Sequence, residues 1–256
     1  MVARTDNVTD PPITAALLLA RRGQAYFSRK LNELSDSEFD EPCRLDGWNR
    51  RQLIAHVGLN ARALTRLVEW ARTGIETPMY SSPQQRTEEI KFAATLPVQA
   101  LRNLSDHAAI HLTVEWRDLA EEAWSNEVRT AQGRTVPVSQ TVWMRTREVW
   151  VHAVDLDNGA RFEDFPAELL DALLTDILAA WDRRRTTENL PFYVLEVVDR
   201  DEKIPDSLRD SSSRSFGTPL VVRGTAAALV DWATGRGNNG VLTGAGSVPS
   251  AAPRWL

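Results

Sequence analysis

Two side chains that could share one metal ion lie four residues apart in an apolar, helix-like stretch. They are Glu148 and His152, separated by three apolar residues. On an α-helix, residues i and i+4 lie on one face about 6 Å apart, so a carboxylate and an imidazole at this spacing can reach the same ion. A second imidazole, His56, lies in another apolar helix-like stretch, residues 53–57. Three protein ligands leave one position of a tetrahedral metal open, which is typical of catalytic centres.

Simpler roles exist for the same side chains. A histidine on an apolar helix is often a core residue that bonds a backbone carbonyl. A Glu–His pair at i, i+4 is often a surface ion pair. The apolar neighbours of Glu148 favour burial instead, and a buried carboxylate requires a cation or a metal. Metal sites are also commonly built in the cores of helical bundles.

Two other groups could compete for a chemical role. His107 and His111 have the same i, i+4 spacing, but their polar neighbours predict a solvated or partly buried face. Cys43 is the only thiol, and the adjacent Arg44 would lower its pKa modestly. No histidine lies near Cys43 in the sequence to act as its base, which disfavours a catalytic cysteine.

One arginine near the C-terminus differs from the others in its setting. Arg236 lies between Gly235 and Gly237. Flanking glycines allow close backbone approach, and a guanidinium binds carboxylates in a bidentate manner. The alternative is an ordinary surface-loop arginine.

The elements that must position these residues are mostly helices in the first part of the chain. Apolar periodicity and capping residues predict long helices over residues 12–34, 49–73, 97–122 and 139–156, with a shorter one over 82–94. A short hairpin is expected within 128–137. His56 would lie on the second long helix, and Glu148 and His152 on the fourth.

After residue 158 the sequence pattern changes from long helices to alternating helices and strands. A helix is predicted over residues 166–185, strands over 192–198 and 219–223, a helix over 225–234, a short edge strand over 240–242 and a mobile loop over 207–215. We therefore expect an α plus α/β protein. Residues 1–158 would form a metal-binding helical bundle, and residues 159–256 a small α/β domain.

Composition excludes several classes of protein. The 256 residues are 43% hydrophobic and 25% charged, with a net charge of −5, which leaves no electrostatic footprint for nucleic acid. No apolar run has the length of a membrane span, and the N-terminus lacks the apolar core of a signal peptide. A single cysteine rules out an internal disulfide. We expect a cytoplasmic monomer that acts on a small molecule.

Several segments together resemble a known family. They are Gly47-Trp48, residues 53–57 with His56, residues 143–156 with Glu148 and His152, and the C-terminal segments 235–237 and 253–256. They resemble the mycothiol-dependent maleylpyruvate isomerases of the DinB-like metalloenzyme superfamily, over nearly the whole chain. The resemblance implies an N-terminal DinB-like four-helix bundle, a smaller sterol-carrier-like α/β domain and an actinobacterial host, with which the arginine-rich composition agrees.

The resemblance also implies the chemistry. Zinc would be bound by His56, Glu148, His152 and water, and His56 and Arg236 would be the catalytic residues. Mycothiol would be the thiol cofactor, although the residues that bind it are not identified. The reaction would convert maleylpyruvate to fumarylpyruvate in gentisate breakdown, by zinc-activated thiolate addition, bond rotation and elimination.

Three other readings stay open at this point. The first is another mycothiol-dependent zinc transferase or detoxification enzyme on the same scaffold. The second is an iron oxygenase, because two histidines and one carboxylate also suit that metal, although a helical bundle argues against it. The third is a non-enzymatic protein with a structural metal, which usually uses cysteine-rich ligand sets.

Overall fold

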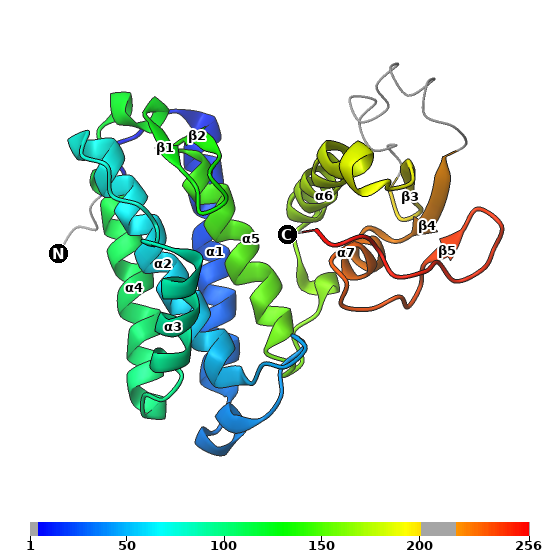
Figure 1. The fold of residues 1–256 in the computed structure, drawn as a ribbon, viewed down its shortest axis with the longest axis horizontal. Coiled ribbons are helices and arrows are strands. Elements are labelled where there is room, and N and C mark those ends of the chain that lie inside the picture. The colour runs from blue at the N-terminus through cyan, green and yellow to red at the C-terminus, as the bar shows by residue number, and fades with distance from the viewer. Residues whose placement is uncertain (1–4, 201–218, 256) are drawn as a thin grey trace. The chain divides into compact units, whose positions relative to one another are not determined.

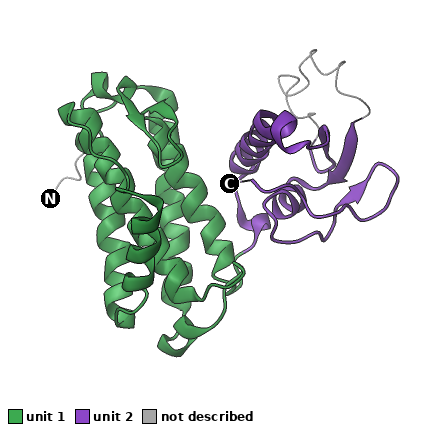
Figure 2. Ribbon diagram, in the orientation of Figure 1, with its two compact units in different colours: residues 1–160 green, residues 161–256 purple. Residues whose placement is uncertain are grey.

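A computed structural model describes residues 5–200 and 219–255 of the chain. The described chain forms two compact units, Met1–Ala160 and Arg161–Leu256, drawn in Figures 1 and 2. The loop predicted over residues 207–215 lies outside the described residues. No described helix combines the length and the apolar character needed to cross a membrane.

Unit 1 is built from helices. The described part contains α1 (Pro11–Glu33), α2 (Arg50–Thr73), α3 (Pro83–Ala93), α4 (Val98–Asp118) and α5 (Gln140–Asp155). Figure 1 shows α1, α2, α4 and α5 side by side. Helix α2 packs most extensively against α4, α1 packs against α5, and α2 also contacts α5. The predicted four-helix bundle is confirmed, with α3 packed as an extra helix against α2.

Capping residues begin and end the helices close to the predicted positions. The Asn49 side chain accepts a hydrogen bond from the Gln52 N–H at 3.0 Å, and Gln52 Oε1 accepts one from the Asn49 N–H. Gly74, with φ of 73°, ends α2 in the left-handed region that favours glycine.

The helix predicted over residues 97–122 ends early, at Asp118. Leu119 adopts extended backbone and is fully buried, and a short 3-10 helix, η2 (Glu121–Ser125), follows and buries Trp124. The prediction was wrong there because helical periodicity does not show where the chain leaves the helix. The apolar side chains of Leu119 and Trp124 pack into the bundle core from non-α-helical backbone. The predicted hairpin is confirmed as antiparallel strands β1 (Glu127–Arg129) and β2 (Thr135–Pro137).

Unit 2 is a small α/β unit, also as predicted. It contains α6 (Ala167–Glu188), α7 (Ala226–Ala233) and a described sheet of β3 (Tyr193–Val197), β4 (Leu220–Gly224) and β5 (Leu242–Thr243). β4 is central, parallel to β3 and antiparallel to β5. Helix α6 extends past the predicted end until Asn189, whose positive φ of 51° terminates it. The aromatic rings of Trp181, Tyr193 and Trp232 pack together in its core.

A buried arginine joins three helices in the middle of the bundle. The guanidinium of Arg145, on α5, donates to the Val57 carbonyl at 2.7 Å and to Asn60 Oδ1 at 3.1 Å on α2. It also donates to Gln24 Oε1 on α1 at 2.8 Å. Arg145 is only 2% exposed, and burial lowers its pKa to about 10. These bonds set the spacing between α2 and α5, the two helices that carry the candidate metal ligands.

Replacing this arginine should destabilise the bundle. In Arg145→Met, three acceptors, two of them buried, lose a charged donor, and we expect a loss of about 3 kcal/mol in the free energy of unfolding. Urea unfolding followed by far-UV circular dichroism measures it. The matched control is Arg62→Met, on an exposed residue of α2, which should leave the midpoint nearly unchanged. Equal stability of the two variants would contradict this role for Arg145.

Candidate metal centre

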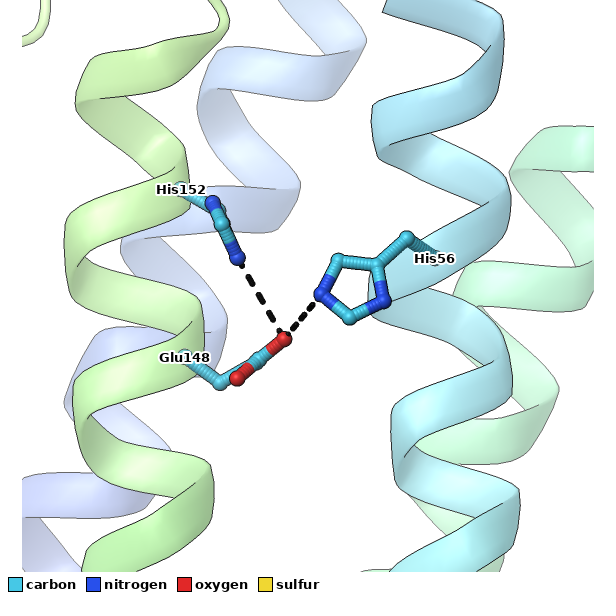
Figure 3. Close-up of side chains that lie close together, drawn as sticks. All are labelled: His56, Glu148 and His152. Carbon is cyan, nitrogen blue, oxygen red and sulfur yellow. Dashed lines mark ion pairs between the residues drawn. The ribbon is translucent and has the colours of Figure 1, made fainter. Parts of the chain in front are cut away.

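Helices α2 and α5 bring His56, Glu148 and His152 together inside the bundle of unit 1. Their ligand atoms all lie within 4.8 Å of one another. Glu148 Oε1 is 2.5 Å from His56 Nε2 and 3.3 Å from His152 Nε2 (Figure 3). The two imidazole rings are nearly perpendicular, with centroids 5.1 Å apart. Both histidines therefore direct Nε2 toward the same carboxylate oxygen.

The carboxylate at the centre of this group is buried. The side chain of Glu148 is 14% exposed, and its Oε1 has no hydrogen bond of normal geometry among the described residues, although His56 Nε2 is close. Burial raises the pKa of Glu148, but the two imidazoles outweigh it and hold that pKa well below its usual range. An ionised, buried carboxylate oxygen toward which two imidazole nitrogens are directed fits a bound cation. Two nitrogens and one oxygen form a ligand set that zinc accepts.

His152 is oriented by a second carboxylate. Its Nδ1 lies 2.8 Å from Oδ2 of Asp155, a side chain fully buried on the next turn of α5. Donation from Nδ1 to Asp155 leaves the Nε2 lone pair free for a metal. Burial lowers the pKa of His152, but Glu148 and Asp155 outweigh it and raise that pKa to about 9. Without a metal, His152 is therefore protonated at neutral pH.

His56 has different surroundings. Its pKa is lowered by burial, against the opposing effect of Glu148. Its Nδ1 lies 3.3 Å from a terminal nitrogen of Arg86, on α3. The indole of Trp48 meets its ring edge-on, with centroids 5.7 Å apart. This imidazole is thus held neutral, with a cation rather than a carboxylate behind it.

Asp155 and Arg86 were not predicted as site residues. Asp155 could have been predicted from the sequence, because an acid three residues after a candidate histidine ligand on the same helix can reach that ring. Arg86 had none, since nothing in the sequence indicates that α3 would bring a side chain to His56.

The competing residues lie apart from the three ligands. His107 is exposed, and His111 is 60% exposed and pairs with Glu115 at 3.5 Å, so the predicted polar face is confirmed. Burial raises the pKa of Cys43, which contradicts the predicted lowering. The guanidinium of the neighbouring Arg44 pairs with Asp157 at 3.1 Å. The thiol instead contacts the carbonyl oxygens of Leu45 and Trp48.

Arg236 lies in unit 2, in the turn that follows α7. Its guanidinium donates to the Thr234 carbonyl, and its backbone N–H donates to the Asp231 carbonyl at 2.9 Å. Gly235 has a φ of 77°, and a Cβ on Gly237 would collide with the Asp231 carboxylate. The backbone of the turn therefore favours glycine at 235, whereas a larger residue at 237 would have to displace the Asp231 side chain. The side chain of Arg236 is partly exposed. Its catalytic role stays a prediction.

Comparison with known proteins identifies the family. Residues 20–157 match the family model described as the mycothiol maleylpyruvate isomerase N-terminal domain. The chain is 45% identical to a crystal structure of the mycothiol-dependent maleylpyruvate isomerase, with a TM-score of 0.86, covering 96% of this chain and 98% of that one. A histidine-to-alanine mutant of that isomerase matches at 44% identity, with the same TM-score and coverage. Comparison with curated protein sequences gave no match. The chain therefore belongs to the mycothiol-dependent maleylpyruvate isomerase family.

Proposed function

We propose that this chain is a monomeric, cytoplasmic enzyme of gentisate degradation that isomerises maleylpyruvate to fumarylpyruvate, with zinc and mycothiol as cofactors. The observation that carries the proposal is the convergence of His56, Glu148 and His152 on one point in a chain of this family. Once His152 has lost its proton to the incoming metal, two neutral imidazoles and one carboxylate form a ligand set with a net charge of −1, which suits a divalent cation with one open position.

The protein's own residues define what happens at that position. His56, Glu148 and His152 would hold the zinc, and Asp155 would keep His152 turned toward it through the 2.8 Å contact. When bound, zinc ionises a coordinated thiol at neutral pH. Burial raises the pKa of the chain's own Cys43, which disfavours this thiol as the nucleophile and agrees with an external thiol cofactor.

Isomerisation of a cis double bond requires that the bond become single for a moment. A bound thiol cofactor would supply a thiolate that adds to the double bond and later leaves again. In between, the electron pair would rest on the conjugated carbonyl oxygen of the substrate as an enolate, and the single bond could rotate. We assign Arg236 to offset the enolate charge, because a guanidinium pairs well with an oxyanion beside a carboxylate.

Metal binding should release a proton. The pKa of His152 is raised to about 9 in the metal-free protein, whereas His56 is neutral and Glu148 is already ionised at pH 7. A metal must displace the His152 proton, so zinc affinity should fall about tenfold for each pH unit below 9. Calorimetric titration in two buffers of different ionisation enthalpy should give about one proton released per zinc at pH 7. Release of no proton would contradict this protonation state.

Removing His56 should abolish both metal retention and isomerisation. His56→Ala leaves two ligands on α5, too few to hold zinc against a chelator. Zinc content is read by atomic absorption, and turnover by maleylpyruvate consumption with and without mycothiol. The matched control is His111→Ala, which removes an exposed histidine from α4 and should keep both properties. A metal-free His56→Ala variant with full activity would refute the proposal. Equal turnover with and without mycothiol would refute the proposed role of mycothiol as cofactor.

Replacing Arg236 should separate chemistry from metal binding. We expect Arg236→Ala to retain zinc and to lose about 100-fold or more in kcat, as removal of an oxyanion donor does. Arg223→Ala, an exposed arginine of the same unit that pairs with Glu196, is the control and should stay active. Loss of zinc from Arg236→Ala would show that the assigned role is wrong.

A further inference from the structure

A positively charged side chain, Arg86 of helix α3, lies beside the metal ligands. The guanidinium of Arg86 lies 3.3 Å from His56 Nδ1, on the side of the ring opposite the Glu148 contact. Its central carbon is 6.0 Å from the ring centroid of Tyr80, in the segment before α3. Burial raises the pKa of Tyr80, and the charges of both Arg86 and Glu148 act on its hydroxyl. Tyr80 and Arg86 therefore share one side of the ligand group.

Arg86 has no carboxylate partner among the described ion pairs. The two acids that follow it on α3 are engaged elsewhere: Glu89 accepts from Gln85 at 2.9 Å, and Glu88 accepts from Gln84 at 2.7 Å. A half-buried guanidinium without an anion is unusual, because desolvating a charge costs free energy that a partner normally offsets. The guanidinium of Arg86 is thus a cation beside the metal ligands that has no anionic partner among the described ion pairs.

The contact between Arg86 and His56 also changes when His56 binds a metal through Nε2. The neutral ring then carries its proton on Nδ1, where ligand histidines usually donate to an acceptor. Asp155 is that acceptor for His152, but Arg86 is a donor. Two donors 3.3 Å apart can both be satisfied by one anionic oxygen that accepts from each.

We propose that Arg86 and Tyr80 form a carboxylate subsite beside the metal, which binds one carboxylate of the dicarboxylate substrate. The carboxylate would accept from the Arg86 guanidinium and from His56 Nδ1. This subsite rests on the proposed function for the identity of the substrate, but its affinity for a dicarboxylate can be measured without turnover. With such a subsite, residues of unit 1 would be sufficient to favour anionic substrates over uncharged ones.

The test compares Arg86→Gln with the wild-type chain, both loaded with zinc. The probe is maleate, with its uncharged dimethyl ester as the matched ligand, and dissociation constants are read by calorimetry. We expect Arg86→Gln to keep its zinc, to bind maleate about 10- to 100-fold more weakly and to bind the ester unchanged. Arg86→Lys should recover part of the affinity. With maleylpyruvate, the substrate KM should rise about as much, with a smaller change in kcat.

The control variant is Arg62→Gln, which removes an exposed arginine of α2 and should leave maleate binding unchanged. Equal maleate affinity of the wild type and Arg86→Gln would overturn the subsite, as would an equal loss in Arg62→Gln or loss of zinc from Arg86→Gln. A wild-type chain that binds maleate through Arg86 but does not turn over maleylpyruvate would refute the proposed function and leave the subsite standing.

Discussion

The buried carboxylate of Glu148 is the constraint on which the arrangement of unit 1 depends. An ionised carboxylate inside an apolar bundle is unfavourable unless positive charge surrounds it. In the metal-free chain the protonated imidazole of His152 supplies that charge. Arg145 lies one turn earlier on α5, where Glu148 favours its charged form. Because Arg145 bonds α1 and α2 at the same time, compensation of one buried charge also joins the ligand-bearing helices.

The two histidines are held by opposite kinds of neighbour. Asp155 stabilises the proton on Nδ1 of His152 and makes that ring a better metal donor. Arg86 faces the corresponding nitrogen of His56, and burial keeps the ring neutral. One ligand is therefore oriented entirely by the protein, whereas the other borders a cation that can accept an external anion. This asymmetry gives the metal centre a side on which a charged substrate can bind.

The single cysteine illustrates how tertiary structure changes a side chain's chemistry. Next to an arginine in the sequence, Cys43 was expected to have a lowered pKa. In the fold, Arg44 pairs with Asp157 and the thiol contacts backbone carbonyls, so burial dominates and raises the pKa. A thiol of this kind is protonated at neutral pH. The proposed dependence on a cofactor thiol agrees with an enzyme that has no reactive thiol of its own.

By itself, the sequence determined the helices, the strands, the α plus α/β class and the shared helical face of Glu148 and His152, because these follow from periodicity and local geometry. Its motifs also identified the family. The family resemblance implied that His56, from a helix about 90 residues earlier, joins that pair, but only the tertiary structure brings its Nε2 to the same carboxylate oxygen. Packing likewise decided that α4 ends at Asp118, that Arg145 fastens α5 to α2, and that Arg86 reaches His56. These contacts join residues far apart in the chain, and no local pattern specifies which helix faces they bring together.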